Sequence, residues 1–352
     1  MVDDADRLRG RLPLRLDART AERAARSDCD RYRTLAAVGA AGADVLTAAY
    51  GPDAPPGASQ QISPFSRAIG FAFEHHLFDH GCKALCDLVE HHDAWRPAVI
   101  EDLRDFEDHA RAERRTTEVI EQRLETGEGP DLVLGARLAL STAAGVVHVH
   151  PDLLTAPPGQ KYFRIGEIKS YLDLDGRTDG TEVATAVRQA AVSAIALRQR
   201  FGREAAGGDV DLVFRLPRRP GASLRRLDAT VEIATIDMSI RRSPTWLAAA
   251  TALTGNRPLT EDGQLRMIPH RWAVSCHAHC ALAEVCRLEA HDRDDIALLG
   301  DSARRALEGV ASISRATELA CGAAPVDPDE DRVADALAAG WAASAAAERS
   351  VT

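Results

Sequence analysis

The stretch RIGEIKSYL, residues 164–172, carries Glu167 and Lys169 two positions apart. Residues i and i+2 of a β-strand point to the same face of a sheet, so the carboxylate and the ammonium group are expected to project together. The lysine stands out because only three of the 43 basic residues are lysines, at positions 83, 161 and 169. An ammonium group is a compact charge with a displaceable proton, which a guanidinium group does not offer. We infer that position 169 needs an ammonium group.

A hairpin is expected to bring a second carboxylate to this face. GVVHVHPDLLTA (145–156) and KYFRIGEIKSYLDL (161–174) are typical of strands, and the turn residues PPGQ separate them. With the turn centred near 158–159, Asp152 lies opposite residue 165 and one diagonal step from Glu167. His148 and His150 share the parity of Asp152. Two carboxylates at this spacing suit Mg²⁺ or Mn²⁺, which can activate water and stabilise the developing charge of a phosphodiester.

Pro151-Asp152 followed by Glu167-Ile168-Lys169 resembles the defining motif of the PD-(D/E)xK nuclease superfamily. Within it, the sequence resembles the RecB-like branch with a C-terminal iron–sulfur cysteine cluster, which includes CRISPR-associated exonucleases and AddB-like subunits. The resemblance implies an α/β fold with a restriction-endonuclease-like mixed β-sheet core flanked by helices. It also implies a divalent metal bound by Asp152, Glu167 and Ile168, with Lys169 assisting the hydrolytic water.

Two further segments carry the resemblance. GFAFEHHL resembles the family's first-motif helix, and Glu74 or His75 in it would supply another metal ligand, with Glu74 preferred. VRQAAVSAIALR resembles the family's last motif, in which a glutamine precedes a tyrosine by four residues. Gln189 joins the catalytic set on this basis, whereas Ser193 replaces the tyrosine and removes any DNA contact that an aromatic ring would make.

The seven cysteines are unevenly distributed, and CHAHCALAEVC (276–286) holds three of them. The intervening His277 and His279 fit a packed core poorly, so a metal or iron–sulfur site is favoured. The resemblance implies that four cysteines hold a [4Fe–4S] cluster that clamps the N-terminal segment to the C-terminal one: Cys29, Cys276, Cys280 and Cys286. Zn²⁺ is the alternative, and either histidine could then replace a thiolate.

Cys82 and Cys86 are open to three interpretations. They could supply the upstream cluster ligand, they could form a separate zinc site with the histidines around them, or they could be the buried face of a helix. The helical interpretation is preferred, because the two thiols lie four positions apart in a segment expected to be helical. Cys321 has no partner in the sequence.

The order of expected elements predicts four regions. Helices are expected over residues 1–50, from Pro64 to about His92, over 98–126 and over 181–201, and from Pro244 onward. Strands are expected at ARLALSTA (136–143), in the hairpin, and at VDLVFRLP (210–217) and DATVEIATIDM (228–238). The regions are an N-terminal helical segment with one cluster cysteine (1–59), a nuclease core (60–245), a helical segment with the cysteine cluster (246–322) and an Ala-rich acidic tail (323–352).

Composition limits the partners. A net charge of −10 argues against a protein that coats nucleic acid, although it permits a local basic groove. The arginine-rich turn RLPRRPGASLRRL could be a phosphate-contacting edge or an ordinary solvated hairpin end. The chain begins without a signal-peptide pattern, and no apolar run is long enough to span a membrane, so a cytoplasmic location and no membrane partner are expected.

The leading hypothesis is a Mg²⁺- or Mn²⁺-dependent deoxyribonuclease that acts on DNA ends or single strands, in repair, CRISPR adaptation or phage defence. Its expected partners are DNA and a helicase or another repair or defence subunit. One alternative is a catalytically degenerate nuclease fold that serves as a DNA-binding or scaffolding subunit. The other is a zinc-stapled protein with no nuclease role.

Overall fold

The computed structural model describes residues 2–40, 42–51, 64–174, 176–217 and 221–351. Most of the expected linker at 51–59, together with Arg218 and Arg219, lies outside these ranges. The chain forms two units. The first comprises Met1–Val2, Arg15–Arg26 and Gln61–Thr245, and the second comprises Asp3–Leu14, Ser27–Gln60 and Trp246–Thr352. The first 59 residues therefore divide between the two units.

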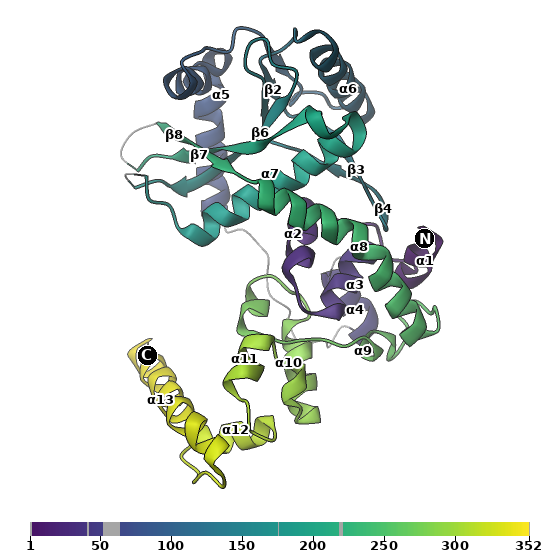
Figure 1. Ribbon diagram of the computed structural model, residues 1–352, viewed down its shortest axis with the longest axis vertical. Helices are drawn as coiled ribbons and strands as arrows, with labels where there is room; N and C mark the ends of the chain where they lie inside the picture. Colours follow the sequence, from purple (N-terminus) through teal and green to yellow (C-terminus); the bar gives the residue numbers. More distant parts are fainter. Residues whose placement is uncertain (1, 41, 52–63, 175, 218–220, 352) are drawn as a thin grey trace. The chain divides into compact units, whose positions relative to one another are not determined.

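A six-stranded mixed sheet forms the centre of the first unit (Figure 1), in the order β1-β2-β5-β6-β7-β8. β1 runs parallel to β2 and β6 runs parallel to β7, whereas the other neighbours are antiparallel. The strands are β1 (Ile100–Asp102), β2 (Leu132–Leu134), β5 (Leu153–Thr155), β6 (Phe163–Leu172), β7 (Ala206–Arg215) and β8 (Ala222–Asp228). The expected mixed α/β class is confirmed.

Helices cover both faces of this sheet. α5 (Pro64–Asp93) packs on one face, where Phe73 and Leu77 meet Ile168 of β6 in a buried cluster. α6 (His109–Thr126) and α7 (Gly180–Phe201) pack on the other face, and Ile165 of β6 belongs to that cluster. Because side chains alternate along a strand, Glu167 is directed to the same face as Ile165. α7 confirms the helix expected over 181–201.

The expected strand at 145–156 is broken in two. β4 (Gly145–Val149) pairs with β3 (Leu138–Thr142) in a separate two-stranded sheet, and only β5 pairs with β6. Pro151 lies at the break, where a residue without an N–H cannot extend a ladder. His148 and His150 therefore do not share a hairpin with Glu167, and that expectation was wrong.

The predicted register was also wrong, by two residues. Leu154 rather than Asp152 pairs with Ile165, and Leu153 pairs with Gly166. One step further along the same register, Asp152 comes opposite Glu167. Because the side-chain period of a strand is two, the shift leaves both carboxylates on one face.

Two other segments differ from expectation. DATVEIATIDM forms the start of α8 (Thr230–Thr254) rather than a strand, and β8 lies within the arginine-rich segment instead. Ile233 and Ile236 are buried at helical spacing, and Asp228 accepts a hydrogen bond from Thr230 N (2.8 Å) where the helix begins. The helix expected at 98–126 starts only at His109, because Asp108 caps α6 there and Ile100–Asp102 pairs with β2.

The second unit is mainly helical. Its helices include α1 (Val2–Arg9), α3 (Asp30–Val38), α4 (Gly42–Tyr50), α9 (Gln264–Met267), α10 (Ala283–Arg293), α11 (Asp301–Ala306), α12 (Ile313–Ala320) and α13 (Pro328–Val351). Short 3₁₀ helices of this unit lie at Val274–Ala278 and Ile296–Leu298. The 3₁₀ helix Arg203–Ala205 and α2 (Ala18–Arg26) belong to the first unit. None of the helices described combines the length and the apolar character needed to cross a membrane.

Candidate functional site

Asp152 lies just before β5, and two features hold it beside β6. A Cβ atom at Gly166 would lie 2.5 Å from Cγ and Cδ1 of Leu153, so only a glycine lets Leu153 sit directly opposite. Asp152 Oδ2 accepts a hydrogen bond from Ile168 N at 2.7 Å. This bond joins two residues that are sixteen positions apart in the sequence. It brings the Pro-Asp segment beside the Glu-x-Lys segment, as the resemblance implied.

Glu167 and Lys169 form an ion pair in a buried environment. Lys169 Nζ donates to Glu167 Oε2 at 2.6 Å, and Glu167 is only 6% exposed. Burial raises the pKa of Glu167 to about 7, Lys169 opposes the shift and Asp152 adds to it. Burial alone would lower the pKa of Lys169, but the charges of Glu167 and Asp152 raise it above its usual value. The site thus holds a carboxyl group that ionises near neutral pH beside a protonated ammonium group.

Glu74 of α5 belongs to the same electrostatic group. The pKa of Glu74 is raised, chiefly by burial and next by repulsion from Asp152, while Lys169 acts to lower it. One turn earlier, a Cβ at Gly70 would lie 3.9 Å from Ser170 Oγ, which shows how closely α5 passes the end of β6. By accessible surface both Glu74 and His75 are exposed, and among the described residues neither forms an ion pair or hydrogen bond with Asp152 or Glu167. Its electrostatic interaction with Asp152 and Lys169 makes Glu74 the stronger candidate for an additional ligand.

The two remaining predicted site residues are buried. The side chain of Ile168 packs in the core under α5, so only its main-chain carbonyl could bind a cation. Gln189 is 7% exposed in α7, the helix that packs against β6. Ser193, at the position of the family's tyrosine, is 2% exposed, so it lies in the core and offers no surface to a ligand.

The four cysteines of the predicted cluster all lie in the second unit. Cys29 precedes α3, Cys276 lies in the 3₁₀ helix Val274–Ala278, Cys280 follows it and Cys286 lies in α10. Burial raises the pKa of Cys280 to about 12, and the charges of Cys276 and Cys29 add to the shift. Burial, Cys280 and Cys29 likewise raise the pKa of Cys286. The four thiols are therefore electrostatic neighbours.

Three of these sulfur atoms accept N–H hydrogen bonds. Arg271 N donates to Cys29 at 3.5 Å, Ala273 N to Cys276 at 3.4 Å, and Arg31 Nη1 to Cys286 at 3.3 Å. Donors aimed at sulfur stabilise the thiolate form, which is the form that binds metals. Within the described residues, no three of the four sulfurs all lie within 4.8 Å of one another.

Arg31 joins the two distant parts of the sequence that supply the cysteines. Its backbone N donates to Pro269 O at 2.9 Å, and its Nε donates to Ile268 O at 3.2 Å. Its Nη2 forms an ion pair with Glu289 Oε2 at 2.9 Å, and it is almost fully buried. Sequence reasoning missed Arg31, because nothing in an arginine-rich sequence distinguishes one arginine that is buried.

Two further cysteines are packed in the core, and the two histidines between the cluster cysteines contact aromatic rings. Cys82 and Cys86 are both buried in the cluster between α5 and the sheet, in the first unit, whereas Cys29 is in the second. The expected continuous helical face was wrong, because α5 is kinked over residues 79–82 and Cys82 has left-handed dihedral angles (φ 60°, ψ 28°). In the second unit, the ring of His277 meets the edge of Trp272 at 5.7 Å, and the ring of His279 meets Tyr32 at 6.1 Å. Cys321 is exposed.

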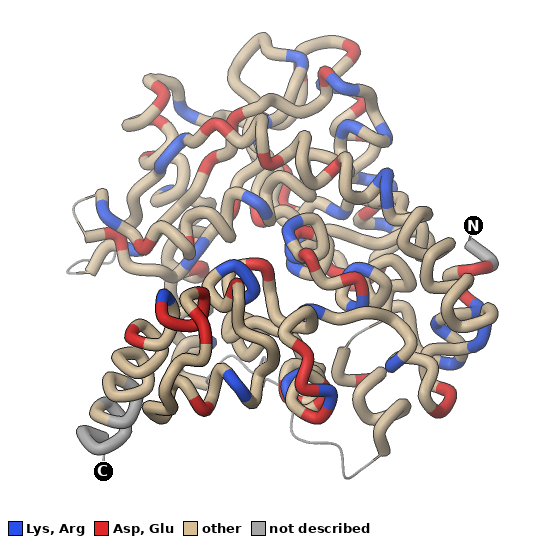
Figure 2. The backbone as a smooth tube through the Cα atoms, turned by 60° about the horizontal axis from the view of Figure 1, so that its bottom comes forward, with Lys and Arg blue, Asp and Glu red and all other residues tan. Residues whose placement is uncertain are grey.

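The described arginines of the arginine-rich segment are partly engaged. Arg226 forms ion pairs with Asp93 and Asp211, both at 2.8 Å, and Arg225 stacks 5.8 Å from the ring of Phe214. Basic and acidic residues are interspersed along the chain (Figure 2). These contacts favour a structural role for Arg226 over a phosphate-contacting one.

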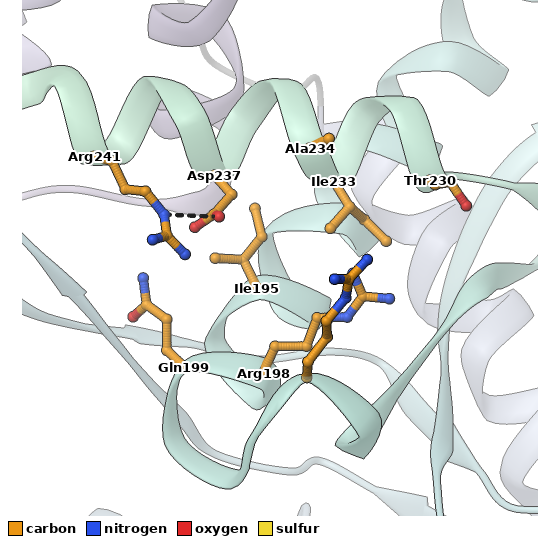
Figure 3. Close-up of a pocket in the computed structure, with 9 residues that line it drawn as sticks. Ile195, Arg198, Gln199, Thr230, Ile233, Ala234, Asp237 and Arg241 are labelled. Carbon is orange, nitrogen blue, oxygen red and sulfur yellow. Dashed lines mark hydrogen bonds and ion pairs between the residues drawn. The ribbon is translucent and has the colours of Figure 1, made fainter.

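A cavity of about 320 Å³ lies between α7 and α8 in the first unit. Its lining includes Ile195 and Arg198 of α7 and Ile233, Asp237 and Arg241 of α8 (Figure 3). Arg241 is paired with Asp237 at 2.9 Å, and Arg198 donates to Ala206 O and Gly207 O. The one carboxylate among the described lining residues is Asp237, which is paired with Arg241. The cavity therefore lacks a pair of carboxylates to hold a catalytic cation, and the candidate site is the group around Glu167.

No protein-family model matches the chain, and a search of the curated proteins finds no match either. Functional inference therefore depends on the chain's own residues. These form two groups, one around Glu167 in the first unit and one of four cysteines in the second.

Proposed function

We propose that this protein is a Mg²⁺- or Mn²⁺-dependent DNA nuclease with a restriction-endonuclease-like core. The observation that carries the proposal is the arrangement at β6, where Lys169 Nζ lies 2.6 Å from Glu167 and Ile168 N holds Asp152. Two carboxylates with an ammonium group beside them suit a divalent ion and the water it activates. The proposed partners are DNA and a helicase or another subunit of repair, CRISPR adaptation or phage defence.

The residues have distinct roles in this proposal. Asp152, Glu167 and the carbonyl of Ile168 would hold the ion, and Glu74 would reach it from α5. A bound ion supplies an activated water and neutralises charge on the phosphate. Lys169 orients the water or the phosphate through its ammonium group, and its pairing with Glu167 keeps that group in place. Gln189 would support the site from α7.

Cleavage of labelled DNA tests the proposal. Glu167→Gln keeps the shape of the side chain but removes the charge that holds the ion, so cleavage with Mg²⁺ or Mn²⁺ should be abolished. Glu121→Gln, an exposed carboxylate on α6, is the matched control and should cleave normally. Cleavage by Glu167→Gln at the wild-type rate would refute the assignment. DNA binding without cleavage by the wild type would favour the degenerate, scaffolding alternative.

We also propose that Cys29, Cys276, Cys280 and Cys286 hold a [4Fe–4S] cluster. A single tetrahedral Zn²⁺ with thiolate bonds of about 2.3 Å brings its sulfurs to about 3.8 Å from one another. A [4Fe–4S] cluster also takes four cysteine thiolates, and all four of these lie in the second unit. Purified protein should be brown and contain about four iron atoms per chain. Colourless protein with one zinc per chain would support the zinc alternative instead.

A further inference from the structure

His109, Glu113 and His148 form a second cluster of metal-binding side chains, outside the group around Glu167. One donor atom from each of the three lies within 4.8 Å of the other two. His109 and Glu113 are four residues apart on α6 and so share one face of that helix. His148 comes from β4, in the separate two-stranded sheet. All three residues belong to the first unit.

The three side chains are arranged around a common point. The rings of His109 and His148 are 4.4 Å apart and meet edge to face at 76°. Glu113 Oε2 lies 3.8 Å from His148 Nδ1, while Arg200 Nη1 approaches the other oxygen, Oε1, at 3.7 Å. Arg200 thus leaves Oε2 available on the side of the histidines.

We propose that His109, Glu113 and His148 bind a divalent transition-metal ion of the Zn²⁺ class. Two imidazole nitrogens and one carboxylate oxygen are a common three-ligand set for Zn²⁺, with water completing the coordination. Mg²⁺ and Ca²⁺ prefer oxygen ligands, so this set selects against Mg²⁺ and favours a softer ion. His148 is exposed, which leaves the bound ion open to solvent.

A bound ion would fasten the β3–β4 hairpin to the start of α6. The hairpin shares no strand pairing with the main sheet among the described residues, although Leu140 and Val149 pack in the main core and Arg137 N donates to Thr116 Oγ1 of α6 at 3.0 Å. A ligand bridge would add a second link to α6, at the start of that helix. Arg200 and the N-terminus of α6 both oppose a cation here, so the coordinate bonds must offset that repulsion. None of the residues proposed for DNA cleavage takes part, so this site goes beyond the proposed nuclease.

Isothermal titration calorimetry of the full chain with Zn²⁺ tests the site. Excess Mg²⁺ is present throughout, so that sites made only of oxygen ligands are already filled. Wild-type protein should bind one more Zn²⁺ per chain than His109→Ala, His148→Ala or the isosteric Glu113→Gln. His150→Ala is the matched control: His150 lies beside His109, but its ring contacts Arg137, and it is outside the three-residue cluster. This variant should keep the site.

Two further measurements distinguish metal binding at this site from metal binding at the cysteines, and loss of the site from loss of the fold. Co²⁺ bound at the site should lack the charge-transfer absorption that thiolate ligands produce, in wild type and in His150→Ala alike. Zn²⁺ should raise the unfolding temperature of wild type but not of Glu113→Gln, because only a ligand that binds the native state stabilises it. Equal Zn²⁺ stoichiometry and affinity in wild type, Glu113→Gln and His148→Ala would overturn the proposal.

Discussion

The ammonium group of Lys169 lies 2.6 Å from Glu167 in a buried site, and an arginine would supply its charge but not its compact shape or its displaceable proton. Replacing Lys169 by Met should lower the rate of DNA cleavage by about 10²–10⁴-fold, the usual contribution of a positioned proton-transferring group. Replacement by Arg should not restore the rate. Mn²⁺ should still bind, because both carboxylates remain. Single-turnover cleavage and Mn²⁺ titration measure the two effects.

Lys83 provides the control for this substitution. It is an exposed lysine on α5 that pairs with Asp87, away from the carboxylates around Glu167. Lys83→Met should therefore cleave DNA as fast as wild type. If Lys169→Met and Lys83→Met were equally active, Lys169 would have no role in the chemistry.

The carboxyl group of Glu167 makes metal binding depend on pH. Because burial raises the pKa of Glu167 to about 7, a proton competes with the metal ion below that pH. The affinity for Mg²⁺ should rise by about tenfold per pH unit up to about pH 7 and then level off. Titration calorimetry between pH 5.5 and 8.5 measures this profile. A flat profile across neutral pH would contradict the role of Glu167, and Glu167→Gln should lose both the affinity and its pH dependence.

The pairing of β5 with β6 positions Asp152, and it depends on Gly166. A methyl group at position 166 would overlap the side chain of Leu153, because its carbon would lie 2.5 Å from Leu153 Cγ. Gly166→Ala should lower the free energy of unfolding by about 1–3 kcal/mol, as overpacking of a core usually does. It should also slow DNA cleavage, because Asp152 moves with β5. Chemical denaturation and the cleavage assay measure the two effects.

Gly180→Ala is the matched control, because nothing lies within 4 Å of a Cβ there and the residue begins α7. Its stability should be unchanged or slightly higher, since alanine favours a helix over glycine. Equal stability of Gly166→Ala and wild type would show that Leu153 does not fix the pairing.

Sequence periodicity predicted some of these elements and missed others for identifiable reasons. β6 and α7 could be predicted, because each has a long pattern with a single period. DATVEIATIDM was expected as a strand, since β-branched residues favour strands locally, but burial of Ile233 and Ile236 on one face made it helical. The register of β5 could not be predicted, because it depends on the contact between Leu153 and Gly166.

Some residues of the candidate sites could likewise be predicted from the sequence, and others could not. Glu167, Lys169 and Asp152 could be predicted to share a face from strand parity and a motif. Arg31 could not, because its role comes from contacts with Ile268, Pro269 and Glu289, far away in the sequence. The cluster at His109 could not be predicted either, since it needs α6 and β4 to be placed side by side. Contacts between segments that are distant in the sequence are not indicated by the local sequence pattern.

The cysteine cluster should stabilise the whole second unit. Cys29 and Cys276 are far apart in the sequence, so joining them closes a long loop, and metal binding offsets the entropy of closing it. Cys29→Ala, Cys276→Ala, Cys280→Ala and Cys286→Ala should each yield colourless, poorly soluble protein. Cys82→Ala and Cys86→Ala should keep their iron, because those thiols are packed in the first unit. Iron quantification in each variant decides between them.

A Cys29 variant with full iron, beside a Cys82 variant without it, would move the fourth ligand to α5. Loss of iron from both would instead mean that the cluster depends on packing in the first unit as well as on its own ligands. Of these two variants, only the Cys29 variant should lose its iron.

Metal-dependent DNA cleavage by the purified full chain is the most direct test of the proposed function. Wild-type protein should cleave labelled DNA with Mg²⁺ or Mn²⁺ and stop when EDTA removes the ion. Asp152→Asn should be inactive under the same conditions while keeping its iron and its unfolding temperature, because its nuclease site alone is altered. Cleavage by Asp152→Asn at the wild-type rate, or wild-type cleavage that persists in EDTA, would contradict a metal-dependent nuclease centred on Asp152 and Glu167.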